Sequence, residues 1–270
     1  MARTFWAAFL LLVLAFSAYA DPFDDCSEHL PFGIPTLTQA VHTSAVCHRG
    51  YAALVDDDRL VPRWVAYYLT AEHTLGCIKR TNNFHADEQP SAVHHAIPKD
   101  YTNSGYDRGH HAPADDFAWD EAEMRDSFSM ANMAPQLHSL NAGAWEKGEN
   151  DVRAWALERG ELLIYVGSIL ADGDQTIGAD HVDVPSAFWK VVVDPARHQA
   201  VAWIMPQDAP ANSDVRKWLQ PVEAIEAASG VILPLPFDID LTVVAMWPAD
   251  VKAWKDRHAA ACPSERRTAR

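Results

Sequence analysis

Runs of apolar residues separated by polar segments divide this chain into expected strands and helices. Residues 63–70 (RWVAYYLT) are rich in aromatic and β-branched side chains, a composition typical of a strand. The segments 161–170, 187–194 and 199–207 have the same character and are expected to be strands as well. Residues 127–136 (SFSMANMAPQ) predict a further, short strand.

Helical spacing occurs in three other segments. Apolar residues recur at roughly helical spacing across 139–160, where Trp145 and Trp155 belong to the apolar stripe and are expected in the core. Helices are also expected over 221–230 and 248–262. Because helices and strands do not alternate regularly, the pattern predicts an α+β fold with a largely antiparallel sheet flanked by helices.

The chain begins with a segment typical of a cleaved secretory signal. Residues 1–20 combine Arg3, an apolar run over 5–16 and small residues before a polar stretch. The apolar run is shorter than the roughly 20 residues that span a bilayer, so a membrane anchor is disfavoured. We therefore expect a secreted or periplasmic protein with one domain over 21–262 and a disordered basic tail over 263–270.

The four cysteines fit an exported protein. An oxidising compartment and an even number of cysteines favour two disulfides, and no C-x-x-C pair is present. Three connectivities are possible. The positions along the chain favour Cys26 with Cys47 and Cys77 with Cys262, although the sequence does not establish this pairing.

The net charge argues against nonspecific attraction to nucleic acid. The chain carries −15, and −16 without residues 1–20, whose only charged residue is Arg3. Such a charge repels phosphate on average. A phosphate-binding function must therefore depend on a local group of arginines and lysines, together with a divalent cation.

The segment 106–117 (YDRGHHAPADDF) contains the strongest chemical signal. A neutral histidine can accept a proton from water near neutral pH, because its unperturbed pKa is about 6.5. We expect His110 to be this base, with Gly109 letting the backbone approach a phosphate. His111 is expected to point the other way on an extended segment and to be structural.

A second group of polar residues follows on the expected helix. The carbonyl oxygen of Asn141 suits magnesium, which prefers hard oxygen ligands. Glu149 lies eight residues later, so on one straight helix the two Cα atoms would be about 12 Å apart and about 80° apart around the axis. We therefore expect Asn141 to bind the metal directly and Glu149 to orient water around it. Arg108 and Arg80 are expected to contact phosphate.

Structural roles are expected for the other polar residues nearby. Asp107 is expected to anchor the loop by hydrogen bonds, with a second metal group as the alternative. Asn132 is expected to make structural hydrogen bonds, and Asp115 and Asp116 to be helix caps or a solvated face. Arg80 begins the polar, irregular stretch 80–105, which predicts a long loop, and long loops are often functional.

Three motifs, DRGHHAPADDF, MANMAPQ and LNAGAWEKGEN, in this order and spacing, resemble the DNA/RNA non-specific endonucleases of the ββα-metal, Serratia nuclease-like group. The resemblance extends less sharply from residue 64 to about residue 237. It implies a ββα-metal finger, products with a 5′-phosphate, and these roles: His110 as general base, Asn141 as metal ligand, Glu149 as the acid near the metal waters, Arg108 as the motif arginine and Arg80 as a phosphate contact. Two departures, His111 in place of a common glutamine and the NMAPQ segment, remove no group that the chemistry needs.

We therefore expect a nuclease that cleaves DNA, RNA or both with one divalent cation, Mg²⁺ or another such as Mn²⁺. A zinc-dependent hydrolase is the alternative enzyme, but no H-E-x-x-H or comparable ligand spacing occurs. A catalytically inactive nucleic-acid-binding homologue is the other alternative. The presence of His110, Asn141 and Glu149 argues against it.

Overall fold

A six-stranded antiparallel sheet forms the centre of the computed structural model, which describes residues 22–89, 95–173, 175–236 and 238–263. The strand order is β11-β10-β7-β4-β3-β2. The strands are β2 (Thr43–Cys47), β3 (Ala52–Asp56), β4 (Val61–Thr70), β7 (Glu161–Ile169), β10 (Ala187–Asp194) and β11 (Gln199–Pro206). Strands β4, β7, β10 and β11 confirm the four long strands predicted from the sequence, whereas the hairpin of β2 and β3 was not predicted.

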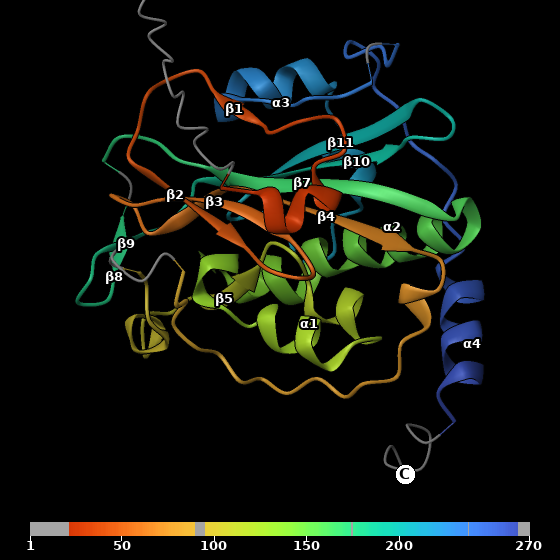
Figure 1. The fold of residues 1–270 in the computed structure, drawn as a ribbon, viewed down its shortest axis with the longest axis horizontal. Coiled ribbons are helices and arrows are strands. Elements are labelled where there is room, and N and C mark those ends of the chain that lie inside the picture. Colours follow the sequence, from red (N-terminus) through yellow and green to blue (C-terminus); the bar gives the residue numbers. More distant parts are fainter. Residues whose placement is uncertain (1–21, 90–94, 174, 237, 264–270) are drawn as a thin grey trace, which may run out of the picture.

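Each face of the sheet packs against a different helix. Along β7, Leu162, Ile164 and Val166 belong to one core, while Leu163 and Tyr165 belong to the other, as alternation along a strand requires. Helix α2 (Glu146–Arg159) covers the first face and α3 (Val222–Ser229) the second (Figure 1). The site described below belongs to the face that α2 covers.

The helix predicted over 139–160 is interrupted. Residues Leu140–Trp145 form a π-helical turn in which Ala142 and Gly143 leave helical backbone angles, and α2 begins only at Glu146. A Cβ on Gly143 would lie 2.7 Å from the Cα of Ala211, so a larger residue would clash with that neighbouring segment. The prediction of one straight helix is therefore wrong, and Asn141 lies in a separate turn from Glu149.

Two short strands and α2 make the expected ββα unit. Strand β5 (Asp107–His110) pairs antiparallel with β6 (Met133–Gln136), and His110 lies opposite Met133. Helix α1 (Glu121–Asp126), which was not predicted, lies between them in sequence. The expected strand over 127–136 is reduced to β6, because Met130–Asn132 form a 3₁₀ turn.

The remaining elements surround this framework. They are β1 (Thr36–Leu37) with β12 (Val231–Ile232), β8 (Thr176–Ile177) with β9 (Val182–Asp183), and α4 (Val251–Ala261). The described parts of the stretch 80–105, residues 80–89 and 95–105, are mostly irregular, as predicted, and include a 3₁₀ turn at Pro98–Tyr101. Among the described residues, no helix has the length and apolar character needed to cross a membrane.

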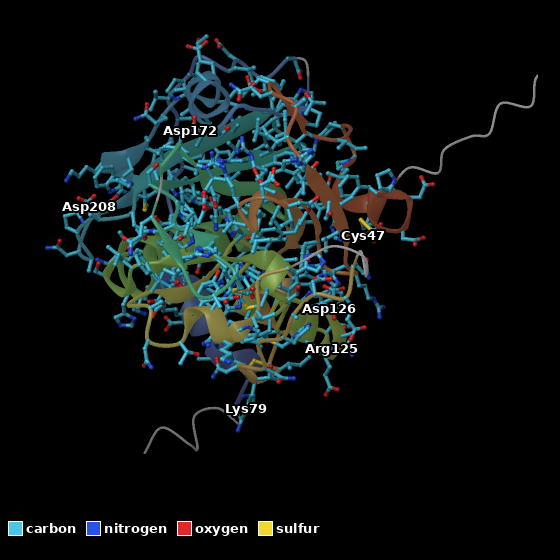
Figure 2. All side chains as sticks on the ribbon, turned by 90° about the vertical axis from the view of Figure 1, so that its left-hand side faces the viewer. Cys47, Lys79, Arg125, Asp126, Asp172 and Asp208 are labelled. Carbon is cyan, nitrogen blue, oxygen red and sulfur yellow. A yellow bond between two sulfur atoms is a disulfide. The ribbon has the colours of Figure 1, made fainter. Side chains whose placement is uncertain are left out.

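Both disulfides confirm the favoured pairing. Cys26 is bonded to Cys47 and Cys77 to Cys262, which attaches the end of α4 to the loop after β4. Figure 2 shows the sulfur bond at Cys47 near one edge of the molecule. The expected signal over 1–20 and the expected tail beyond residue 263 lie outside the described residues.

Candidate active site

Four of the five predicted site residues line one pocket of about 200 Å³. Strand β5 contributes His110, the turn before α2 contributes Asn141, α2 contributes Glu149, and the long loop contributes Arg80. Pro113, Asp115, Glu146 and Arg153 complete the lining. The fold therefore brings residues as far apart in sequence as Arg80 and Arg153 into one pocket.

His110 is held by aromatic rings and has one ring nitrogen without a partner. Its ring centroid lies 5.6 Å from that of Phe84 and 5.1 Å from that of Phe128, and its side chain is almost fully buried. Nε2 has no hydrogen-bond partner among the described residues. The ring also makes a hydrogen bond to the backbone of Arg108, which we assign to Nδ1, so that Nε2 keeps its lone pair.

The environment of His110 keeps the imidazole neutral. Burial is the largest cause, followed by the charges of Arg80 and His111, and together they lower the pKa of His110 to about 3. The side chain can therefore accept a proton throughout the neutral range. The pKa of His110 in this pocket is therefore well below the unperturbed value of 6.5.

His111 points into the core on the opposite side, as predicted. Its Nε2 lies 3.1 Å from Ser168 Oγ, its Nδ1 lies 3.3 Å from the carbonyl oxygen of Asn132, and the side chain is fully buried. Asn132 confirms its expected structural role, because its amide bonds the backbone of Ala112 and Ser127. The two adjacent histidines thus serve different regions of the molecule.

Asp107 holds Asn141 in place. The amide nitrogen of Asn141 donates to Asp107 Oδ2 at 2.9 Å, and His138 Nδ1 lies 2.8 Å from the same oxygen. This anchoring is the role preferred for Asp107 from the sequence. Because the nitrogen end of the amide faces Asp107, the carbonyl oxygen of Asn141 is left available to the pocket.

Glu149 lies between two cations. Its Oε1 is 3.9 Å from Lys190 Nζ, and its Oε2 is 3.8 Å from Arg153 Nη2. Burial raises the pKa of Glu149 to about 7, although both cations act to lower it. A carboxyl with a pKa shifted by burial beside specific charges is a common feature of functional sites.

Behind Glu149 lies a buried ion pair that the sequence analysis missed. Arg153 Nε donates to Asp116 Oδ1 at 2.6 Å, and the hydroxyl of Tyr67 donates to Asp116 Oδ2 at 2.9 Å. Asp116 is only 2% exposed, so its expected role as a cap or part of a solvated face is wrong. Asp115, in contrast, is exposed and lines the pocket. The spacing of Glu149 and Arg153, four residues apart on one helix, indicated only their own contact and not the pair with Asp116.

The two predicted arginines occupy different positions. Arg80 lines the pocket, with its guanidinium 5.0 Å from the ring centre of Phe128, whereas its neighbour Lys79 projects away from the molecule (Figure 2). Arg108 is not brought into the pocket. Its Nη2 donates to the carbonyl oxygen of Pro98 at 2.9 Å, and its guanidinium lies 4.9 Å from the ring centre of Phe84.

Gly109 has a packing role that was not predicted. A Cβ at this position would lie 2.6 Å from the side chain of Gln136 on the paired strand β6. The backbone of Gly109 is buried. Close packing of β5 on β6 therefore accounts for this glycine without any approach to a phosphate.

The donor atoms of the pocket fit a hard divalent cation. Oxygen donors come from Asn141, Asp115, Glu146 and Glu149. Mg²⁺ and Mn²⁺ prefer carboxylate, carbonyl and water oxygens, whereas zinc sites are usually built from histidine and cysteine. Within the described ranges, no three or more His, Cys, Asp and Glu side chains are grouped to hold a metal ion. This chemistry fits magnesium or manganese better than the zinc alternative.

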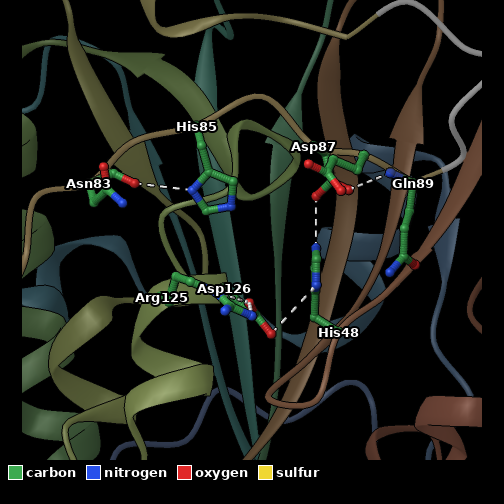
Figure 3. Close-up of a pocket in the computed structure, with 8 residues that line it drawn as sticks. His48, Asn83, His85, Asp87, Gln89, Arg125 and Asp126 are labelled. Atoms are coloured by element: carbon green, nitrogen blue, oxygen red, sulfur yellow. Dashed lines mark hydrogen bonds and ion pairs between the residues drawn. The ribbon is translucent and has the colours of Figure 1, made fainter.

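A larger pocket, of about 540 Å³, is lined by two histidines, His48 and His85, and by three carboxylates, Asp87, Glu88 and Asp126. Figure 3 shows His48 between Asp87 and Asp126. The Nε2 atom of His48 lies 2.7 Å from Asp87 Oδ2, and Nδ1 lies 3.8 Å from Asp126 Oδ2. Ser129 also donates to Asp87. Although burial opposes it, these partners lower the pKa of Asp87 below its usual value.

Comparison with known proteins gives one consistent result. The family described as DNA/RNA non-specific endonuclease matches residues 29–238, which include every residue that lines the smaller pocket. Mitochondrial endonuclease G of Bos taurus is 31% identical over 221 residues, covering 76% of this chain and 72% of the relative. A nuclease of Nostoc sp. is 31% identical over 192 residues, covering 67% of this chain and 69% of the relative.

Among solved structures, the crystal structure of an EndoG/EndoGI complex contains a similar chain. The TM-score is 0.64 at 26% identity, and the match covers 77% of this chain and 90% of that chain. The antiparallel sheet with its ββα unit is therefore the architecture of a known group of nucleases.

Proposed function

This chain belongs to the DNA/RNA non-specific endonuclease family, and from that premise we propose that it hydrolyses DNA and RNA with one divalent cation, Mg²⁺ or Mn²⁺, and His110 as general base. Membership of the family makes the protein a metal-dependent nuclease that cleaves phosphodiester bonds. The observation that supports this proposal is that Nε2 of His110, which has no hydrogen-bond partner in the described part of the chain, lies in the same pocket as Asn141 and Glu149.

His110 supplies the proton acceptor. Its Nε2 takes a proton from a water molecule, the water oxygen bonds to phosphorus, and the phosphorus bond to the leaving oxygen breaks. The backbone hydrogen bond and the rings of Phe84 and Phe128 fix the imidazole, so the lone pair is already oriented when substrate arrives. We assign Arg108 to support of this arrangement, because it packs on Phe84.

Asn141 and Glu149 prepare the pocket for the cation. Asn141 would bind it through the carbonyl oxygen, while Asp107 holds the amide nitrogen. Glu149 would orient water within the pocket, and Arg80 would contact a phosphate oxygen. A bound cation would supply charge stabilisation to the phosphate and to the leaving oxygen.

Export is the second part of the proposal. The two disulfides support an oxidising compartment, because such bonds are rare in reducing cytosol. Together with the signal expected over 1–20, they favour a secreted or periplasmic protein with one domain over 21–262.

Cleavage of three substrates by the purified mature protein tests the function. Plasmid DNA, single-stranded DNA and RNA are incubated with Mg²⁺, with Zn²⁺ or with a chelator, and both cleavage and binding are measured. We expect cleavage with Mg²⁺ and none with chelator. Cleavage that requires zinc and is not supported by Mg²⁺ would favour the zinc hydrolase, and binding without cleavage would favour the inactive homologue.

A further inference from the structure

Lys190 is a charged residue in the middle of an apolar sheet face. On β10 it shares a sheet face with Phe188 and Val192, and on the neighbouring strands it lies opposite Val166 of β7 and Trp203 of β11. All four of these neighbours belong to the core under α2. Lys190 itself is 1% exposed, where an aliphatic residue would be the ordinary choice.

The ammonium group of Lys190 has very few partners. Nζ makes no hydrogen bond to any described residue and lies 4.9 Å from the ring centre of Trp145. The nearest opposite charge is Glu149, at 3.9 Å. A buried ammonium without hydrogen bonds is costly, and replacing both members of a buried ion pair by apolar residues often does no harm to stability. Stability therefore does not explain why this chain has the buried pair of Lys190 and Glu149.

The geometry around Glu149 suggests what the lysine does. Each carboxylate oxygen faces one cation, Arg153 at 3.8 Å and Lys190 at 3.9 Å. Both distances exceed the length of a direct hydrogen bond, so the cations attract the carboxylate without occupying its lone pairs. Arg153 is already bonded to Asp116, whereas Glu149 is the one carboxylate among the described residues within ion-pair distance of Lys190.

We propose that Lys190 is a positioning residue that holds the carboxylate of Glu149 at the pocket while leaving its oxygens able to accept hydrogen bonds from water. The proposal rests on the proposed function, in which Glu149 orients water. Lys190 touches neither substrate nor cation. Its effect on cleavage must therefore pass entirely through Glu149.

A double-mutant cycle on cleavage tests this dependence. Lys190→Met keeps a long apolar side chain and removes the charge. We expect it to lower the rate of plasmid cleavage about 10- to 100-fold, the usual effect of losing a group that orients a metal-site residue. In a Glu149→Gln background, Lys190→Met should lower the remaining rate less than about threefold, because the carboxylate is already absent. Equal losses in both backgrounds would overturn the proposal.

Lys217 offers a matched control. Its Nζ also lies over a tryptophan ring, 4.6 Å from the centre of Trp218, but the side chain is exposed. Lys217→Met should therefore leave the cleavage rate near normal. A loss as large as that of Lys190→Met would indicate that lysine–tryptophan contacts, and not the contact with Glu149, affect the rate.

Unfolding by urea without metal gives a second readout that does not depend on cleavage. Each single mutation leaves one buried charge with fewer partners, so the double mutant should have a higher midpoint than the sum of the single effects predicts. Additive midpoints would show that the two side chains do not interact and would overturn the proposal. If the wild type failed to cleave any substrate but the midpoints were coupled, the proposed function would fail while the contact stood. Should Lys190→Met not fold, Lys190→Gln replaces it in the same cycle.

Discussion

Two pockets of this molecule contain a histidine near carboxylates and an arginine. These groups are paired with one another in the larger pocket, whereas in the smaller pocket the histidine keeps a ring nitrogen without a partner among the described residues. In the larger pocket, His48 has a carboxylate near each ring nitrogen, and the pKa of Asp87 is lowered by its partners. In the smaller pocket, Nε2 of His110 has no partner among the described residues, and burial raises the pKa of Glu149 to about 7.

The difference indicates that the paired groups of the larger pocket stabilise the fold, whereas the unpaired groups of the smaller pocket are suited to chemistry. Paired polar groups offset the cost of their own burial, whereas an unpaired buried group costs free energy that the folded state must recover elsewhere. Such a cost is expected at a site whose missing partners are substrate, water or cation. The size of a pocket is a poor guide here, because the larger pocket, of about 540 Å³, is the one whose groups already satisfy one another.

Removing Asn141, the proposed metal ligand, should lower the cleavage rate more than the other changes described below. Asn141→Ala should lower the cleavage rate at least about 100-fold, because a metal acting as a Lewis acid is worth several kcal/mol. The fold should remain intact, as judged by circular dichroism. Asn212→Ala, an exposed asparagine, should cleave normally. A folded Asn141→Ala protein that cleaves at the wild-type rate would contradict the assignment of Asn141.

The pH dependence of cleavage should follow Glu149 and not His110. His110, with a pKa of about 3, stays neutral through the neutral range, whereas Glu149, with a pKa of about 7, loses its carboxylate charge as the pH falls. The rate should therefore fall about tenfold per unit below about pH 6. Plasmid cleavage measured from pH 5 to 9 checks this expectation.

Two glutamate variants make the pH test specific. Glu149→Gln should cleave slowly at every pH, and its rate should no longer fall as the pH drops below about 6. Burial and then Asp120 also raise the pKa of Glu123 to about 7, but Glu123 does not line the active-site pocket. Glu123→Gln should therefore keep both the wild-type rate and its fall at acidic pH. If the rate of Glu149→Gln still fell at acidic pH as in the wild type, another group would control the pH dependence.

The sequence predicted the parts of this site that depend on local pattern. Aromatic and β-branched runs located β4, β7, β10 and β11, and the spacing of motifs located His110, Asn141 and Glu149. Each strand and each motif is a local pattern of about ten residues, and the motifs follow one another in the expected order. The pairing of cysteines was also favoured correctly from their positions.

What was missed depends on contacts between distant segments. Asp116 and Lys190 carry charges that usually indicate the surface, and their burial is decided by Arg153 and Glu149, which lie 37 and 41 residues away. Arg108 was placed in the site by its motif, but its guanidinium is held by Pro98 and Phe84 in a loop without periodicity. No pattern along the chain records such contacts.

In the larger pocket, loss of the Ser129 hydroxyl should lower the stability of the protein without changing its cleavage rate. Ser129 is fully buried, donates to Asp87 and accepts from the backbone nitrogen of Ala131 at 3.1 Å. Ser129→Ala should lower the free energy of unfolding by about 1–3 kcal/mol, because it leaves buried groups unsatisfied, with little change in the cleavage rate. Urea unfolding checks the first expectation. The exposed Ser186→Ala should change stability less.

Salt should have the smallest effect. With a net charge of −15, the protein must capture its substrate through a few arginines, and salt screens these contacts. Raising the salt concentration should lower kcat/KM several-fold, and Arg80→Ala should flatten this dependence. Arg216→Ala, which removes an exposed arginine paired with Asp214, should not. A wild-type rate that stays flat from low to high salt would exclude arginine-based capture.

The comparison of the two pockets is tested most directly by measuring cleavage rate and unfolding midpoint for His110→Ala and His48→Ala side by side. His110→Ala should lose about 10²- to 10⁴-fold in rate, the usual contribution of a general base, and should lower the unfolding midpoint less than His48→Ala does, because Nε2 of His110 has no partner among the described residues to leave unsatisfied. His48→Ala should keep its rate and unfold at lower urea, because Asp87 and Asp126 lose their partner. The opposite pattern, a folded His48→Ala protein that has lost activity beside an active His110→Ala protein, would contradict the assignment of both pockets.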